Sequence, residues 1–142
     1  MGIVGILFIS WTYVSKAAPK STSESFKRVK LGQAELQVIV ADTFLSREQG
    51  LSGHPVLPKN EGMLFVFETS GTYPFWMKDM AFPLDFVWID QNMRVSQITE
   101  NISPATFPQS FSSQKPIKYV LELTAGGVAE NNISVGDPLV FE

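Results

Sequence analysis

The sequence contains no cysteine and a single histidine, His54. The lack of cysteine excludes a disulfide framework, thiolate zinc or iron–sulfur sites, and a cysteine nucleophile. One histidine cannot form the clusters of histidine ligands that catalytic zinc sites use. We therefore expect no metal site and no cofactor, and a fold that is held together by core packing alone.

Positive charge is also scarce, because 11 Lys and Arg against 14 Asp and Glu give a net charge of −3. This balance argues against nucleic acid or an anionic membrane surface as a main partner. The chain also lacks a Gly-x-Ser-x-Gly elbow, a P-loop and a dinucleotide-binding glycine fingerprint. With 142 residues, 44% of them hydrophobic and 18% charged, it is suited to one folded domain.

The N-terminal residues differ in composition from the rest of the chain. Residues 2–14 are uncharged and mostly apolar, but the run is shorter than the roughly 20 residues that a spanning helix needs. We interpret residues 1–17 as a signal peptide or an uncleaved N-terminal anchor, and the small, polar residues 18–27 as a flexible tether. This interpretation predicts an exported protein that is periplasmic, secreted or membrane-anchored, with membrane contact only through the N-terminus. The alternative is a hydrophobic N-terminal strand of a cytosolic protein.

Residues 28–142 read as one β domain, because short apolar segments alternate with turn residues. Alternation of apolar and polar residues predicts a half-buried strand over 36–40, and continuous apolar runs predict buried strands over 63–67 and 84–89. Further strands are expected over residues 29–31, 73–77, 94–98, 118–123 and 138–141. We predict a mainly β, single-domain antiparallel sandwich or barrel of jelly-roll-like form, with one or two short helices.

Helix signals are few. Ser46-x-x-Gln49 resembles a capping box and Gly50 suits a helix end, which predicts one or two helical turns over residues 46–51. Residues 126–136 predict a turn or a second short helix. Residues 101–116 are rich in proline and small polar residues, which is typical of a long irregular loop that serves as a lid or a binding loop.

Asp85 lies in the middle of the expected strand 84–89, which is apolar on both faces. A buried carboxylate is costly unless it is paired or hydrogen-bonded. The candidate partners are Lys78, His54, Arg47 and the backbone N–H groups of residues 78–82. We interpret Asp85 either as a structural carboxylate that fixes that loop or as a ligand-binding or proton-transferring acid.

Most aromatic residues between positions 65 and 88 read as core. Trp76 differs, because Lys78 lies on the same face of its strand and indicates contact with water. An indole beside a cationic head can form a stacking wall for a ligand. Glu122 is a weaker candidate for a functional acid than Asp85. It lies either on a solvated strand face or in a site. His54, in a turn, is either exposed or part of the same site.

Several short motifs occur together in one order. They are Gly50-Leu51, Glu61-Gly-Met-Leu-Phe-Val-Phe67, Phe75-Trp-Met-Lys-Asp79, Pro83-Leu-Asp85, Tyr119-Val-Leu-Glu-Leu123, Ala125-Gly126 and Gly136-Asp137. In this combination the chain resembles the DUF192 family of small, often exported bacterial and archaeal proteins, over roughly residues 33–142. The resemblance implies a compact, mainly β fold and no established reaction. The chain departs from the family pattern at His54, where an Arg is usual, and at Asp79, where an Asn is usual.

Three functions remain open. The first is a binding module for a small polar or sugar-like ligand, and its pocket would be lined by Trp76, Lys78, Asp85, His54, Glu122 and the 101–116 loop. The second is a carboxylate-based hydrolase in which Asp85 and Glu122 act as acid and base about 5 to 9.5 Å apart. The third is a structural or interaction protein of the cell envelope with no small ligand. We favour the first, expect a monomer, and leave open whether the protein is an enzyme.

Overall fold

The computed structural model describes residues 25–142. The signal peptide or anchor predicted over residues 1–17 lies outside the described residues, as does most of the predicted tether. The first strand begins at Phe26, inside the segment predicted as a tether. Within residues 25–142, no helix is long and apolar enough to cross a membrane.

Residues 25–142 are mainly β structure with short helices. The strands are β1 (Phe26–Leu31), β2 (Ala34–Ala41), β3 (Glu61–Gly71), β4 (Phe75–Trp76), β5 (Leu84–Ile89), β6 (Val95–Ile102), β7 (Ser110–Phe111), β8 (Ile117–Thr124) and β9 (Leu139–Phe141). The helices are α1 (Phe44–Gln49), α2 (Gly127–Glu130) and the 3-10 helix η1 (Pro104–Thr106). The predicted mainly β fold with one or two short α-helices is confirmed.

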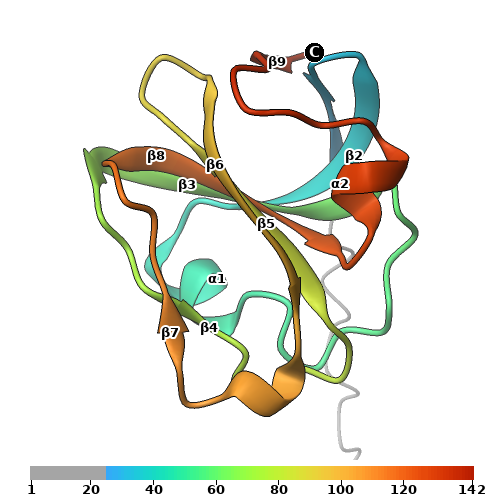
Figure 1. The fold of residues 1–142 in the computed structure, drawn as a ribbon, viewed down its shortest axis with the longest axis vertical. Coiled ribbons are helices and arrows are strands. Elements are labelled where there is room, and N and C mark those ends of the chain that lie inside the picture. The colour runs from blue at the N-terminus through green and yellow to red at the C-terminus, as the bar shows by residue number, and fades with distance from the viewer. Residues whose placement is uncertain (1–24) are drawn as a thin grey trace, which may run out of the picture.

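One curled sheet in the order β6-β5-β8-β3-β2-β1-β9 dominates the fold (Figure 1). A separate ribbon, formed by β4 and β7, lies near α1 at one end of the molecule (Figure 1). The prediction that all strands pair antiparallel is wrong at one point, because β2 and β3 are parallel. Parallel pairing needs a long connection, and here α1 and the loop after it provide one. The jelly-roll form stays a prediction.

The two edge strands of the curled sheet approach each other. Arg94 and Pro138 form an isolated antiparallel bridge. The N–H of Val95 donates to the carbonyl of Asp137 at 3.0 Å, and the N–H of Gly136 donates to the carbonyl of Val95 at 2.8 Å. These hydrogen bonds satisfy backbone groups that an open sheet would leave exposed at its edges.

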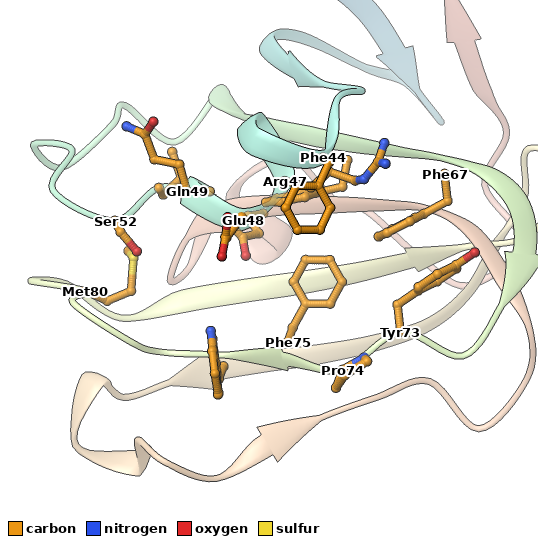
Figure 2. A pocket seen from close by; sticks show the side chains of 15 residues that line it. Phe44, Arg47, Glu48, Gln49, Ser52, Phe67, Tyr73, Pro74, Phe75 and Met80 are labelled. Atoms are coloured by element: carbon orange, nitrogen blue, oxygen red, sulfur yellow. The ribbon is translucent and has the colours of Figure 1, made fainter.

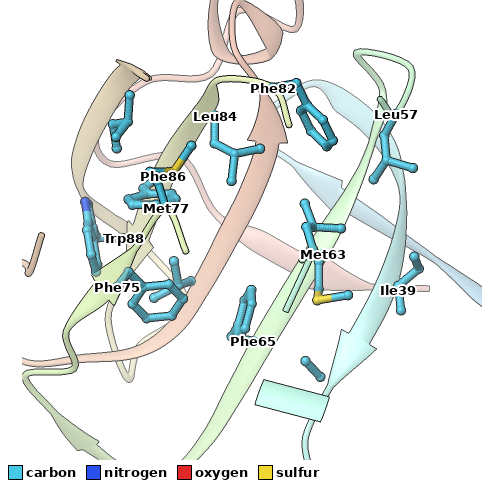
Figure 3. Close-up of a cluster of buried hydrophobic side chains, with 14 of the residues drawn as sticks. Ile39, Leu57, Met63, Phe65, Phe75, Met77, Phe82, Leu84, Phe86 and Trp88 are labelled. Carbon is cyan, nitrogen blue, oxygen red and sulfur yellow. The ribbon is translucent and has the colours of Figure 1, made fainter. Parts of the chain in front are cut away.

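Both faces of the sheet are covered by apolar side chains. All six residues of β5 are buried, as its continuous apolar run predicted. The first core cluster lies on the face toward the β4–β7 ribbon and includes Phe65, Phe75, Phe86 and Trp88 (Figure 3). The second core cluster lies on the other face, beside α2, and includes Leu64, Val87, Leu121 and Leu123.

Asp85 is fully buried on the second face and accepts three backbone hydrogen bonds. Its carboxylate oxygens accept from the N–H groups of Asn101 at 2.8 Å, Gly126 at 2.9 Å and Val128 at 3.1 Å. Gly126 has φ of +88°, which glycine adopts without strain. Asp85 therefore fixes the end of β6 and the turn into α2 to the centre of the sheet. This corrects the predicted partners, which were Lys78, His54, Arg47 and the 78–82 loop.

Helix α1 begins two residues earlier than predicted. Thr43 is its N-cap, and the Thr43 hydroxyl accepts from the N–H of Ser46 at 3.1 Å. The Ser46 hydroxyl in turn accepts from the N–H of Thr43 at 3.0 Å, so Ser46 closes the capping box from the third helical position. Gly50 ends the helix, as predicted, and donates its N–H to the carbonyl of Ser46. The chain then turns toward the first core cluster, where Leu51 is buried.

Replacing Asp85 by alanine should destabilise the fold strongly. Asp85→Ala leaves three backbone donors without their acceptor, that of Val128 buried and those of Asn101 and Gly126 part-buried, so we expect the free energy of unfolding to fall by about 3 kcal/mol. Urea unfolding followed by tryptophan fluorescence measures this change. Asp90→Ala is the matched control, because the Asp90 carboxylate accepts from the N–H groups of Asn92 and Arg94 in an exposed turn. Equal losses in the two variants would contradict the role of Asp85.

Candidate functional site

A pocket lies between α1, the segment after it and β4. Its volume is about 490 Å³, which is within the range of small-molecule sites. Aromatic side chains dominate its lining, and they are Phe44, Phe65, Phe67, Tyr73, Phe75 and Trp76. Figure 2 shows the rings of Phe44, Phe67, Tyr73 and Phe75 around this space. We call it the α1 pocket.

The aromatic wall is held by the first core cluster. Phe65 and Phe67 are two residues apart on β3 and therefore point to the same face. The ring of Phe75 meets Phe65 edge-on at a centroid distance of 4.9 Å and meets the buried Trp88 at 5.6 Å. Tyr73 stacks on Phe67 with centroids 3.7 Å apart. Because these rings support one another, the wall is formed without a ligand, which lowers the cost of binding.

Arg47 of α1 lies at one side of the pocket. One guanidinium nitrogen donates to the carbonyls of Asp42 at 2.7 Å and Val66 at 2.8 Å. The guanidinium also lies over the ring of Phe67, 5.3 Å from its centroid. Arg47 therefore attaches α1 to β3, and its charge is directed toward backbone carbonyls and an aromatic face.

Glu122 lies on β8, at the inner end of the α1 pocket. The sheet register pairs it with Met63 of β3 and Phe86 of β5, so its side chain points to the face of the aromatic cluster. It is only 5% exposed, and it lines the pocket. The alternative that Glu122 lies on a solvated strand face is therefore wrong.

The carboxyl of Glu122 is buried without compensation from its surroundings. Among residues 25–142, no hydrogen-bond donor reaches its buried Oε2 atom. Burial raises the pKa of the Glu122 carboxyl from 4.5 to about 8. At neutral pH the group is therefore mostly protonated and can donate a hydrogen bond through its O–H. Buried polar groups are normally paired, so one that faces a pocket marks a candidate functional residue.

Asp85 and Glu122 do not form an acid–base pair. The register pairs Asp85 with Leu123, whereas Glu122 pairs with Phe86. Because successive residues of a strand point to opposite faces, the two carboxyl groups lie on opposite sides of the sheet. The paired-carboxylate hydrolase hypothesis requires both groups on one side of a substrate, and this arrangement does not supply that geometry.

The other predicted site residues divide between the pocket and the surface. Trp76 lines the pocket at its rim, where it is 54% exposed and meets the ring of Phe107 edge-on. Lys78 is exposed and His54 is half-buried, and both lie outside the α1 pocket. Of the five predicted residues, the structure brings Trp76 and Glu122 to one pocket.

Several lining residues were not predicted. Phe44, Arg47 and Tyr73 line the pocket, but their sequence neighbourhood gives no binding motif. The nearest signal is Gly50-Leu51, which follows α1 directly. The 101–116 segment was predicted as a long irregular loop that serves as a lid or a binding loop. It contains η1 and β7, and β7 pairs with β4; its role as a lid or a binding loop stays a prediction. In the part of the chain that the structure describes, no three side chains of His, Cys, Asp or Glu gather as metal ligands.

Comparison with known families supports the resemblance seen in the motifs. The model of the DUF192 family, described as "Uncharacterized ACR", matches residues 27–141. A comparison with curated proteins gives no match.

Two solved structures share this fold. One is a protein from Sinorhizobium meliloti described as a "putative transcription regulator"; it is 35% identical, and the match covers 82% of this chain and 94% of that chain with a TM-score of 0.76. The other is a protein of unknown function from Novosphingobium aromaticivorans; it is 25% identical, and the match covers 86% of this chain and 90% of that chain with a TM-score of 0.77.

The stability of the protein should fall as pH rises through the titration range of Glu122. Because its pKa is 4.5 in the unfolded chain and about 8 in the folded protein, the folded state holds a proton that the unfolded state releases between these values. Relative to high pH, the stability linked to the protonated Glu122 is therefore fully present below pH 4.5 and is lost by about pH 8, where the cost of burying the ionised carboxyl is largest. In Glu122→Gln this loss is absent.

Thermal unfolding followed by circular dichroism at a series of pH values measures the difference. We expect the melting temperature of the wild type to fall relative to that of Glu122→Gln as pH rises. Glu48→Gln is the control, since Glu48 lies in the same pocket but is exposed, and its curve should run parallel to that of the wild type. Parallel curves for the wild type and Glu122→Gln would show that Glu122 is not desolvated.

Proposed function

The chain belongs to the DUF192 family, and we propose from the α1 pocket that it is a binding module for a small molecule. One observation carries the proposal: a buried carboxyl group, that of Glu122, faces an aromatic-lined pocket of about 490 Å³. A polar group in this position weakens the fold, so its presence favours a role in binding.

The polar groups around the pocket indicate what kind of ligand it suits. The Ser52 hydroxyl donates to the carbonyl of Lys78 at 2.9 Å, and the Tyr73 hydroxyl donates to the carbonyl of Thr69 at 2.7 Å. Because these two hydroxyl groups already donate to backbone carbonyls, Glu122 is the polar group that a ligand contacts at the inner end of the α1 pocket. This arrangement favours a ligand with a flat apolar body and one polar head. A sugar-like ligand stays a prediction, and it would have to direct its other hydroxyl groups toward the open side.

The rim of the pocket offers a surface for the body of the ligand. Trp76 presents an indole that is 54% exposed and that meets the ring of Phe107 edge-on. A flat ring can stack on such a surface, and each aromatic pair contributes about 0.5–1.5 kcal/mol beyond the area that it buries. Trp76 therefore serves as the stacking wall in this proposal.

Two other functions are less well supported. The description of the Sinorhizobium meliloti relative suggests transcriptional regulation, but the net charge of −3 of this chain does not favour nucleic acid. A structural role in the cell envelope would not require a pocket with a buried carboxyl group. Export through residues 1–17 remains part of our proposal and rests on their sequence alone.

A binding screen with matched variants tests the proposed function. Small cyclic and aromatic compounds and simple sugars are screened by ligand-observed NMR, and the compounds that bind are titrated by calorimetry. We expect Trp76→Ala to weaken binding by about 3- to 10-fold, because it removes the stacking wall. Val135→Ala, at a position that is 63% exposed and outside the α1 pocket, should bind as the wild type does. The proposal fails if no compound binds, or if binding is indifferent to both Trp76→Ala and Glu122→Gln.

A further inference from the structure

The ligand class follows from what surrounds the carboxyl group of Glu122. Resting on the proposed function, we propose that the polar head of the ligand is a cationic amine, which the α1 pocket holds between aromatic faces and the carboxylate of Glu122. Binding then releases the proton of the Glu122 carboxyl group to solvent.

The aromatic lining favours a cation over other polar heads. The faces of aromatic rings carry negative charge density, and a cation within about 6 Å of a ring centroid is attracted to it. The α1 pocket brings six such side chains from α1, β3, β4 and the β3–β4 connection around one space. An anionic head would meet these faces and an acidic side chain together, so the pocket disfavours anions.

The charged side chains that line the α1 pocket have a net charge of −1 when Glu122 is ionised, which one positive charge would balance. Strands β3 and β5, which flank β8, present the apolar side chains of Met63 and Phe86 next to Glu122. Glu61 lies on the same face at the start of β3, outside the pocket lining. Helix α1 contributes Arg47 and Glu48 to the lining, and the β3–β4 connection contributes Tyr73. The charges of Arg47 and Glu48 cancel, so ionisation of Glu122 gives the pocket a net charge of −1. A cationic ligand restores neutrality.

Arg47 does not fill this role itself. Its guanidinium donates to the carbonyls of Asp42 and Val66 and lies over Phe67. These contacts direct the charge of Arg47 away from Glu122. When Glu122 ionises, Arg47 is therefore already engaged, and a bound cation can supply the counter-charge.

The proton balance is a consequence of the burial of Glu122. Because burial raises the pKa of this carboxyl group to about 8, the empty pocket holds it mostly protonated at pH 7. An ammonium ligand favours the ionised form, so the carboxyl O–H bond breaks and its proton passes to the buffer. The ammonium N–H groups then donate to the carboxylate oxygens, including the buried Oε2. No oxidant, reductant or leaving group is involved.

Pairs of amines and alcohols with the same carbon skeleton test this inference. Benzylamine and cyclohexylamine are compared with benzyl alcohol and cyclohexanol by calorimetry at pH 7, in phosphate and in HEPES. Tris is avoided, because it is itself a primary ammonium ion at pH 7 and would compete for the pocket. Phosphate and HEPES differ in ionisation enthalpy, so the difference in heat reports the protons released. We expect each amine to bind at least about 10-fold more tightly than its alcohol, with release approaching one proton per site. Glu122→Gln should lose both the preference and the release, whereas Glu35→Gln, at an exposed position of β2 outside the α1 pocket, should keep both.

Each other outcome is decisive. If the alcohols bind as tightly as the amines, or if binding releases no proton, the inference is overturned while the proposed binding function stands. The same holds if neither amine binds but neutral compounds from the wider screen do. If no compound of any class binds, both proposals fall. The melting temperature of Glu122→Gln confirms that the variant is folded when its binding is measured.

Discussion

The buried carboxylate of Asp85 is the interaction on which the arrangement of the sheet depends. It lies in β5, between β6 and β8, and a carboxylate there is tolerable only because its oxygens accept from Asn101, Gly126 and Val128. These donors lie near the end of β6, in the turn after β8 and in α2. One side chain therefore attaches the end of β6 and the turn into α2 to the middle of the sheet and places α2 over the second core cluster.

Glu122 is the counterpart of Asp85 across one step of the same register. Asp85 pairs with Leu123, and the next pair joins Phe86 to Glu122. The two acids thus point to opposite faces and have different surroundings. Asp85 is surrounded by backbone donors, and Glu122 is surrounded by aromatic rings. The face of Asp85 is organised for stability. The face of Glu122 keeps a group that weakens the fold, which is common where a protein has a site to maintain.

The sequence predicts local features of this fold well and long-range ones poorly. The strand over residues 84–89 was predicted correctly, because a continuous apolar run with turn residues on both sides has few other solutions. The parallel pairing of β2 and β3 was missed, since it depends on how the chain crosses over and not on the residues of either strand. The start of α1 was missed because Ser46 suits two positions of a capping box equally well.

In the candidate site too, the features that depend on neighbouring residues were predicted, and those that depend on long-range contacts were not. Trp76 was identified from the Lys78 beside it, which is local information. The partners of Asp85 are backbone N–H groups, which every residue except proline carries. The identities of the side chains therefore do not indicate which residues bind Asp85. The contribution of Arg47 to the pocket depends on where α1 lies against β3, and a helix without buried residues gives no apolar stripe from which to predict its packing.

The two sides of the α1 pocket should differ in the rate at which their backbone amides exchange hydrogen with solvent. One side is the short helix α1, and the other is the sheet. Helix α1 buries none of its six residues and is held by its capping box and by Arg47, whereas β5 and β8 are covered on both faces. Amides of α1 therefore exchange with solvent through local opening, and amides of β5 and β8 exchange only when the whole domain unfolds. We therefore expect the helical side of the pocket to open more often than the sheet unfolds, which would let a small molecule reach Glu122 while the strand that carries it stays intact.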